Sequence, residues 1–155
     1  MITVVITSCN RWPLLKRTMD SFLKFNTLPV KEIIIVEDSN NVAMPEQIIE
    51  RYPDVTVLFN AGNIGQVKSI DKAYKEVKTP FLFHLEDDWE FYKPGFMEKS
   101  LDILEHNDKI LNVWLRERYD TNTHPVEPEI LTAGSTQYSL LEVYVMGGNW
   151  HGFTW

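Results

Sequence analysis

The amino-acid sequence predicts an α/β fold: a single domain with a mainly parallel central sheet flanked by helices. Uninterrupted runs of β-branched and aliphatic residues, such as 2–7 and 33–36, are typical of strands buried on both faces. Over the first 115 residues, these runs alternate with segments in which apolar residues recur at helical spacing. This alternation is typical of strand–helix–strand units, whose strands pair in parallel. The length of 155 residues suits one domain.

The strands are predicted from apolar runs that end in turn-forming residues. They are expected at 2–7, 33–36, 55–59, 81–85 and 110–115. A later strand is expected at 140–145, followed by a turn at 147–148. The polar stretch 119–139 contains Pro125 and Pro128, so we expect an exposed loop there, with room for a short hairpin.

The helices are predicted from apolar residues on one face and from local start and stop signals. Asn10 is a candidate cap for the first helix, and Pro13 suits its first turn. Pro80 ends the third helix, because proline cannot donate a backbone hydrogen bond. The helices are expected at 13–23, 45–52, 64–77 and 96–105.

Composition narrows the class of protein. A net charge of −7 argues against a general nucleic-acid binder, which normally carries a basic face. Cys9 is the single cysteine, so an internal disulfide is excluded and a reducing compartment is expected. The sequence has neither a signal-peptide pattern nor an apolar stretch of membrane-spanning length. We therefore expect a cytoplasmic protein.

The polar residues of the chain gather where the predicted strands end. Right-handed crossovers place the carboxyl ends of parallel strands at one edge of the sheet, where ligands of open α/β sheets bind. The turns at 7–11, 37–40, 60–65 and 86–88 are therefore expected to share one edge.

Three adjacent carboxylates, Glu86, Asp87 and Asp88, follow the apolar strand 81–85. Like charges side by side repel each other, and a bound divalent cation would relieve the repulsion. Alternation along an extended segment puts Glu86 and Asp88 on one side and turns Asp87 away. We expect Asp88 to reach a metal ion and Glu86 to act through water. The alternative is a solvated acidic turn that caps the next helix.

Two other turns have chemistry that suits a nucleotide. Asp38 follows a buried strand and is equally suited to accept a uracil or ribose hydrogen and to form an Asx-type turn with Ser39 and Asn40. The turn 63–65 precedes a helix N-terminus, where backbone N–H groups attract phosphate. Lys68 is the expected cation nearby, although it equally suits a solvated helix face.

The remaining candidate ligands have ordinary explanations as well. His84 is expected to be a half-buried core residue, and Cys9 a small core residue. His151 lies in a glycine-flanked polar turn and is a candidate third metal ligand. Four tryptophans are more typical of core than of sugar platforms, although the first of them could line a pocket beside the carboxylates. They are Trp89, Trp114, Trp150 and Trp155.

These motifs together resemble the nucleotide-binding half of family-2 glycosyltransferases with the GT-A fold. The segments that carry the resemblance are ITVVITSCNRWPLLKRTMDSFL, KEIIIVEDSN and NIGQVKSIDKAYKEVKTPFLFHLEDDW. The family pattern is an Asn-Arg turn after the first strand, a strand ending in two acids, an Asn-x-Gly turn and a strand ending in Asp-x-Asp. Here the last motif reads Glu-Asp-Asp. The resemblance covers 2–104 and implies a Rossmann-like GT-A domain, with 105–155 as a shortened acceptor-side part.

The resemblance implies a donor and a set of ligands. The donor would be a nucleoside-diphosphate sugar, most often a UDP-sugar, bound with Mn²⁺ or Mg²⁺. By motif position, the base would be bordered by Thr7, Cys9 and Arg11. Asp38 would hold uracil or ribose. The ribose and diphosphate would be flanked by Asn63, Gly65 and Lys68. Glu86 and Asp87 would bind ribose or metal-bound water, and Asp88 would be the direct metal ligand.

The catalytic base is not identified by the resemblance. Family members usually continue into an acceptor region with a catalytic acid, but no acidic residue follows Glu142 here. Asp87 and Glu142 are the candidates we carry forward, and Glu117, Glu127 and Glu129 are further ones. A partner chain could also supply the base.

Three hypotheses follow for the function. The first is a glycosyltransferase with an unknown acceptor, which could be a glycan, a lipid or a protein. The second is a non-catalytic nucleotide-sugar-binding module completed by a partner chain. The third, a nucleotidyltransferase, is disfavoured because the turn 8–11 lacks the glycines of that class. An open edge near 140–145 would favour a homo-oligomer.

Overall fold

The protein forms two compact units, Met1–Tyr92 (unit 1) and Lys93–Trp155 (unit 2). The computed structural model describes residues 1–116, 119–121, 123–142 and 151–155. Each unit has its own four-stranded sheet. The division predicted after residue 104 separates functional parts rather than compact ones, and it stays a prediction.

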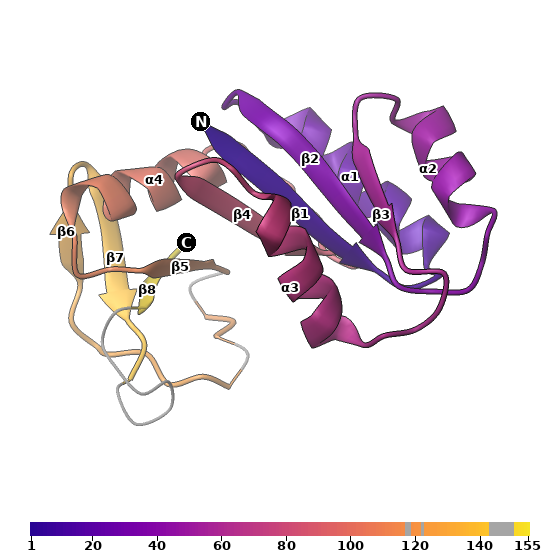
Figure 1. Cartoon of the computed structure of the whole chain (residues 1–155). Helices are drawn as coiled ribbons and strands as arrows, with labels where there is room; N and C mark the ends of the chain where they lie inside the picture. The colour runs from indigo at the N-terminus through magenta and orange to yellow at the C-terminus, as the bar shows by residue number, and fades with distance from the viewer. Residues whose placement is uncertain (117–118, 122, 143–150) are drawn as a thin grey trace. The chain divides into compact units, whose positions relative to one another are not determined.

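Unit 1 contains a parallel sheet in the strand order β3-β2-β1-β4 (Figure 1). The strands are β1 (Ile2–Ser8), β2 (Val30–Glu37), β3 (Thr56–Phe59) and β4 (Phe81–Glu86). Four predicted strands are therefore present, and the predicted α/β class with a parallel sheet is confirmed. Strand β1 pairs with both β2 and β4, so it is central.

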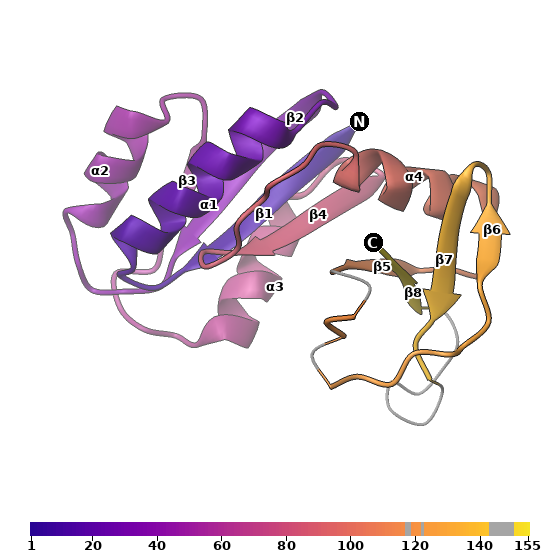
Figure 2. The ribbon, with the colours of Figure 1, turned by 180° about the vertical axis from the view of Figure 1, so that it is seen from behind.

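Three helices cover the two faces of this sheet. They are α1 (Trp12–Phe25), α2 (Met44–Arg51) and α3 (Gln66–Glu76). Opposite views show α3 on one face and α1 with α2 on the other (Figures 1 and 2). Pro13 lies in the first turn of α1 as expected, but the predicted cap is wrong. Arg11 is the N-cap of this helix, and no side chain caps it.

Unit 1 has an apolar layer on each side of the sheet. On the α3 side, Val5, Ile34 and Val36 form a buried cluster with Ala73 of the helix. On the α1 side, the buried helix face includes Leu15, Met19 and Phe22. Because β1 is buried along its whole length, its continuous β-branched sequence is explained by apolar contact on both faces.

Unit 2 combines one helix with a mixed sheet in the order β5-β8-β7-β6. The elements are α4 (Phe96–His106), β5 (Asn112–Leu115), β6 (Leu131–Ala133), β7 (Thr136–Leu140) and β8 (His151–Thr154). Strands β5 and β8 are parallel, whereas the other two pairs are antiparallel. The core of this unit joins α4 to the hairpin through Ile103, Ile110, Ala133 and Tyr138.

The second half of the chain confirms one expectation and corrects two. The short hairpin expected within 119–139 is present as β6–β7, but the stretch is not exposed throughout, because Tyr138 is 2% exposed. The hairpin turn at Gly134 has a positive φ of +56°. The strand expected at 140–145 starts earlier, as β7, and ends at Leu140. Residues 143–145 and the predicted turn at 147–148 lie outside the described residues.

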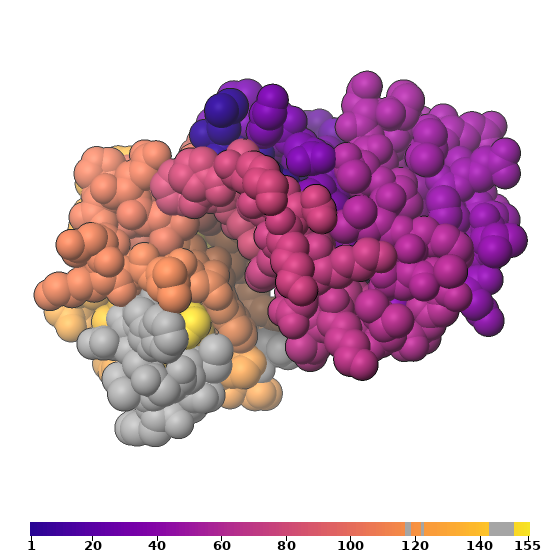
Figure 3. Space-filling view, viewed as in Figure 1, coloured from indigo at the N-terminus to yellow at the C-terminus, as the bar shows by residue number. Residues whose placement is uncertain are grey.

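The outer side of α3 is exposed to solvent, and Val67 of this helix is 73% exposed. Figure 3 shows the surface of the molecule from the side on which α3 lies. Among the described helices, none has both the length and the apolar character that a membrane span requires.

We expect the aromatic cluster of unit 1 to dominate its stability. Phe22 is fully buried, with its ring centroid 6.2 Å from that of Phe83 and 5.7 Å from that of Phe91. Phe22→Ala should lower the free energy of unfolding by about 3–5 kcal/mol, because it removes buried area and leaves a cavity. Urea denaturation measures this. The neighbouring change Leu23→Ala, at a side chain 50% exposed, should cost less than about 0.5 kcal/mol. Equal losses would contradict this account of the core.

Candidate functional site

The carboxyl ends of β1, β2 and β4 meet at one edge of the unit 1 sheet, as the sequence predicted. Ser8 at the end of β1 is in register with Glu37 at the end of β2. Thr7 is in register with Glu86 at the end of β4. Paired residues of parallel strands point to the same face, so consecutive residues at these ends face α3 and α1 in turn. This alternation decides which helix each carboxylate meets.

Asp38 holds the turn that leads into α3. Its Oδ1 accepts hydrogen bonds from the backbone N–H of Ile64 (2.8 Å) and from Nδ2 of Asn60 (2.9 Å), and Oδ2 accepts from the N–H of Gly65 (2.9 Å). The carboxylate therefore fixes the 60–65 turn rather than an Asx-type turn with Ser39 and Asn40. These contacts also explain why α3 starts at Gln66, later than predicted.

The charge of Asp38 is stabilised in place. Burial alone would raise the pKa of this carboxyl group, which is 5% exposed. The hydrogen bonds from Ile64, Asn60 and Gly65 outweigh burial and hold the pKa below its usual value. The predicted contact between Asp38 and uracil or ribose stays a prediction.

Two residues that the sequence analysis missed support this turn. Asn60 donates a second hydrogen bond from Nδ2 to Oγ of Ser69 (3.0 Å). Lys72 donates from Nζ to Oδ1 of Asn60 (2.6 Å). Lys68, the cation predicted from the sequence, is exposed on α3. The lysine that contacts the turn is Lys72. The signal in the sequence was the spacing of Lys68 and Lys72, which places both within one turn of the helix.

Gly65 and Cys9 lie beside this turn. Gly65 is the N-cap residue of α3 and has a φ of +93°, a conformation that favours glycine. Cys9 is exposed, so its predicted place in the core is wrong. Its Sγ lies 3.1 Å from the carbonyl oxygen of Asp38 and 3.5 Å from Nδ2 of Asn63. The structure thus brings Cys9, Asp38, Asn63 and Gly65 together, while Thr7 is buried near the end of β1.

The three acidic residues after β4 have three different environments. Asp87 is fully buried and faces α1, where Nε of Arg11 donates to its Oδ2 (3.0 Å) and Nη2 donates to its Oδ1. Glu86 faces α3 and accepts from Nε2 of Gln66 (2.7 Å). Asp88 has a side chain 43% exposed, with Oδ2 3.5 Å from Nη1 of Arg11. Asp87 turns away from Glu86 as expected, but Asp88 does not share the side of Glu86, because it approaches the same Arg11 as Asp87.

Arg11 is the counterion of this acidic tip, which we define as Glu86, Asp87 and Asp88. Partial desolvation disfavours the charge on its guanidinium, but pairing with Asp87 outweighs this effect and raises the pKa of Arg11. A planar guanidinium that meets a carboxylate through two N–H groups forms a strong, directional pair. Arg11 therefore anchors the tip to the start of α1.

The donor atoms of the tip fit a hard divalent cation. Mn²⁺ and Mg²⁺ prefer carboxylate oxygens, often one or two, and complete their shell with water and phosphate. Asp88 is the exposed carboxylate of the three and can serve in this way. Across the described residues, no group of three or more His, Cys, Asp or Glu side chains is arranged to hold an ion. A site here would therefore take part of its ligands from a bound phosphate.

The other predicted histidine and acid candidates lie apart from these interactions. His84 is half-buried, as expected, with Nδ1 3.1 Å from the hydroxyl of Tyr74. His151 starts β8 in unit 2, and its predicted metal-binding role stays a prediction. Glu142 also belongs to unit 2, where its N–H donates to the carbonyl of Pro125 (3.0 Å). Glu117 lies outside the described residues.

The remaining acid candidates and the tryptophans are also placed in part. In unit 2, Glu127 N–H donates to the carbonyl of Leu140 (2.8 Å), and the carbonyl of Glu129 accepts from Oγ of Ser139 (2.8 Å). Neither contact uses the carboxylate. The described tryptophans among the four discussed above are half-buried: Trp89, Trp114 and Trp155. Trp150 lies outside the described residues.

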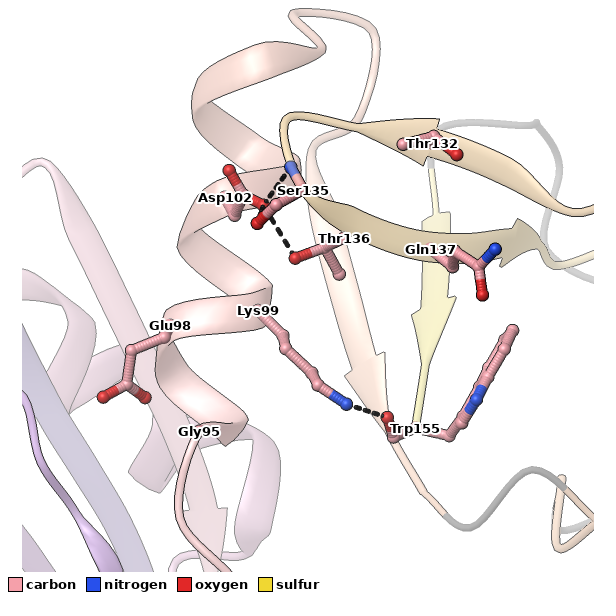
Figure 4. Close-up of a pocket in the computed structure, with 9 residues that line it drawn as sticks. All are labelled: Gly95, Glu98, Lys99, Asp102, Thr132, Ser135, Thr136, Gln137 and Trp155. Atoms are coloured by element: carbon pink, nitrogen blue, oxygen red, sulfur yellow. Dashed lines mark hydrogen bonds between the residues drawn. The ribbon is translucent and has the colours of Figure 1, made fainter.

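Unit 2 has a polar depression of about 760 Å³ beside α4 (Figure 4). Asp102 fixes one wall, because its Oδ2 accepts from Ser135 N–H (2.8 Å) and Thr136 Oγ1 (2.7 Å). The Thr136 hydrogen bond is the main reason why the pKa of Asp102 is lowered. Lys99 donates to the carbonyl of Trp155 on the opposite wall. These contacts explain how the hairpin and β8 are tied to α4.

Comparison with protein families agrees with the α/β fold and with the polar residues found at the sheet edge of unit 1. The model of glycosyl transferase family 2 matches residues 3–154, nearly the whole chain. The chain therefore belongs to glycosyl transferase family 2.

Two individual proteins extend this result. The uncharacterized glycosyltransferase YwdF of Bacillus subtilis (strain 168) is 28% identical over 157 residues, a match that covers 96% of this chain and 56% of the relative. The chain thus spans about half the length of that relative. The crystal structure of GalNAc-T7 with UDP, GalNAc and Mn²⁺ has a TM-score of 0.60 at 21% identity, covering 74% of this chain and 23% of that one. This likeness establishes the GT-A fold.

We expect Asp38→Asn to destabilise the protein in a pH-dependent way. At neutral pH, an amide that presents N–H to buried donors should cost about 1–3 kcal/mol. Because the folded-state pKa of Asp38 is lowered, its carboxylate stabilises the fold above the unfolded-state pKa. That contribution is lost as the pH falls below about 4, through the folded-state pKa.

The test compares urea denaturation of wild type and Asp38→Asn between pH 7 and pH 2.5. The difference in unfolding free energy should shrink on acidification, since only the wild type loses the carboxylate contribution. A difference that stays constant across this range would contradict the role given to Asp38.

Proposed function

We propose that this chain binds a nucleoside-diphosphate sugar together with Mn²⁺ or Mg²⁺ and acts as a glycosyltransferase. A UDP-sugar is the expected donor, and a hexosyl group is the group expected to be transferred. One observation carries the proposal: in a member of glycosyl transferase family 2, the acidic tip and the turn held by Asp38 lie at the same edge of one sheet.

The electrostatics of this edge support a requirement for metal. The tip has three carboxylates and one guanidinium, Arg11, in contact with two of them. A diphosphate brought to this edge would add negative charge to an existing excess. A divalent cation between Asp88 and the phosphates would offset both charges, and we propose Asp88 as its protein ligand. Glu86-Asp87-Asp88 is thus the proposed form of the DXD motif in this chain.

The proposed nucleoside contacts lie around the turn 60–65. Asp38 is proposed to accept a uracil N–H or a ribose hydroxyl at Oδ2, beside the hydrogen bond that this oxygen accepts from the N–H of Gly65. Thr7 and Cys9 are proposed to border the base. Asn63, Gly65 and Lys68 are proposed to flank the ribose and diphosphate, with Lys68 exposed at the start of α3.

The chemistry of sugar transfer needs a stabilised diphosphate leaving group. A bound divalent ion supplies Lewis-acid stabilisation of the charge that develops there. Burial raises the pKa of Asp87, and its pairing with Arg11 opposes that rise. The same pairing holds the strand end in place, while Asp88 stays available at the surface. The solved structure of similar fold holds UDP and Mn²⁺, which supports a nucleotide and a divalent ion as the proposed bound groups.

The proposed function covers three chemical classes of acceptor and one candidate for the catalytic base. Asp87 is buried and paired with Arg11, which suits it to positioning better than to accepting a proton. Glu142 remains the candidate base. We propose a glycan, lipid or protein acceptor, and a homo-oligomer or partner chain as a further requirement. The single cysteine supports a reducing, cytoplasmic compartment.

Binding of UDP should depend on metal through Asp88. Isothermal titration of the wild type with UDP should show affinity that rises about tenfold or more when Mn²⁺ is present, because the ion links carboxylate and phosphate. Asp88→Ala should lose this enhancement and keep the metal-free affinity.

A matched control removes the same charge elsewhere on unit 1. Asp54 is exposed and lies before β3, at the opposite end of the strands. Asp54→Ala should retain the full Mn²⁺ enhancement. If wild-type UDP binding is indifferent to Mn²⁺, the proposed function fails. If Asp88→Ala still responds to the ion, the ligand is another residue.

Turnover separates a glycosyltransferase from a non-catalytic binding module. The chain incubated with UDP-glucose, UDP-galactose or UDP-N-acetylglucosamine and Mn²⁺ should release UDP slowly by hydrolysis, and Asp88→Ala should abolish release. A coupled UDP assay measures the rate. Metal-dependent binding without any release, with or without acceptor arrays, would favour the binding module.

A further inference from the structure

We propose that Glu37, the first of the two acids that end β2 and one to which the family motifs assign no role, is a positioning residue for the acidic tip, acting through Asn10 and Arg11. It would set where the guanidinium lies and thereby how freely Asp88 takes a metal ion. The metal part of this inference rests on the proposed function. The part that concerns Arg11 does not.

The first observation is the burial of Glu37. Its side chain is fully buried at the end of β2, although glutamate is rarely buried without a partner. Oε1 accepts the backbone N–H of Asn10 (2.8 Å), and Oε2 has no hydrogen-bond partner in the described part of the chain. A buried carboxylate with one oxygen unused costs free energy. A side chain kept only for packing would be better served by an apolar residue of similar size.

The second observation is the conformation of Asn10. This residue has a φ of +55°, in the left-handed region that residues other than glycine rarely adopt. Two contacts hold it there. Glu37 accepts its N–H, and Nδ2 of Asn41 donates to its Oδ1 (2.8 Å). Both contacts come from the end of β2 and the turn that follows, so β2 fixes the turn after β1.

The third observation is what this turn delivers. Arg11, the next residue, is the N-cap of α1 and has neither a capping side chain nor an acidic residue in the first turn to support it. Glu37 brings an acceptor oxygen to this helix start from a neighbouring strand, through the N–H of Asn10. The direction in which Arg11 leaves the turn decides whether its Nε and Nη2 both reach Asp87.

The hydrogen bonds of Glu37 with Asn10 and of Arg11 with Asp87 and Asp88 form one path across the sheet edge. It runs from Glu37 on β2, through Asn10 after β1, to Arg11, and from there to Asp87 and Asp88 after β4. The two-point contact with Asp87 tolerates little displacement, because both N–H groups must align. If the turn relaxed, the guanidinium would leave Asp87 unpaired or move onto Asp88. Either outcome would weaken a cation site at Asp88.

The test replaces Glu37 while keeping its volume. Glu37→Met removes the acceptor, Glu37→Gln keeps an acceptor oxygen, and Val36→Ala shortens a fully buried neighbour on the α3 side. The first readout needs no ligand: the Nε–H resonance of Arg11, recorded by NMR on ¹⁵N-labelled protein. The second is the Mn²⁺ enhancement of UDP affinity by isothermal titration.

We expect Glu37→Met to shift the Arg11 Nε–H resonance and speed its exchange with water. It should also remove most of the Mn²⁺ enhancement of UDP affinity, because residues that orient metal ligands typically change metal affinity by about 10–100-fold. Glu37→Gln should restore both readouts to near the wild-type values. Val36→Ala should lower the melting temperature and leave both readouts unchanged, which separates positioning from general destabilisation.

Each outcome decides the proposal. A Glu37→Met protein with unchanged Arg11 resonance and unchanged Mn²⁺ response overturns it. If that variant does not fold, Asn41→Ala can be used, because it removes the other hydrogen bond that holds Asn10. It should produce smaller changes in the Arg11 resonance and in the Mn²⁺ response, and the absence of any change in both would also overturn the proposal. If wild type fails to bind UDP with Mn²⁺, the proposed function falls, while the Arg11 resonance still decides the role of Glu37.

Discussion

The pairing of β1 with β2 and β4 is the constraint on which the candidate site depends. β1 is buried on both faces, and its register with its neighbours aligns Ser8 with Glu37 and Thr7 with Glu86. Because side chains alternate between faces, this register sends Glu37 and Asp87 toward α1 but Asp38 and Glu86 toward α3. A shift of one residue in either pairing would exchange these directions and separate every contact described at the edge.

The two faces of the edge handle negative charge in different ways. On the α3 side, Asp38 accepts hydrogen bonds from backbone N–H groups and an amide, and no cation of the described residues contacts it directly. On the α1 side, Asp87 is matched by the guanidinium of Arg11. The first arrangement shapes a turn, and the second holds a strand end. Asp88 lies between solvent and Arg11, and its contact is weaker than those of Asp38 and Asp87. It is therefore the carboxylate best placed to bind a different partner.

The sequence predicted what depends on local pattern. Apolar runs gave the four strands of unit 1 and their common edge, and the motif order gave the family. It did not predict that Asn60 and Lys72 would support Asp38, because those contacts join residues far apart along the chain. Cys9 was misplaced for a similar reason: a small apolar residue suits a core, and its exposure follows from the turn that Glu37 holds. The short hairpin was expected, but the burial of Tyr138 within it was not, because this residue lies in a polar sequence.

The turn at Gly134 restricts which sequences are compatible with unit 2. A Cβ atom there would lie 2.0 Å from Oδ1 of Asp102, and the residue's φ of +56° independently disfavours most side chains. Steric and conformational demands thus coincide at one position. In a saturation mutagenesis library selected for folded protein, position 134 would be nearly invariant, although it lies on a hairpin tip where substitutions are ordinarily tolerated.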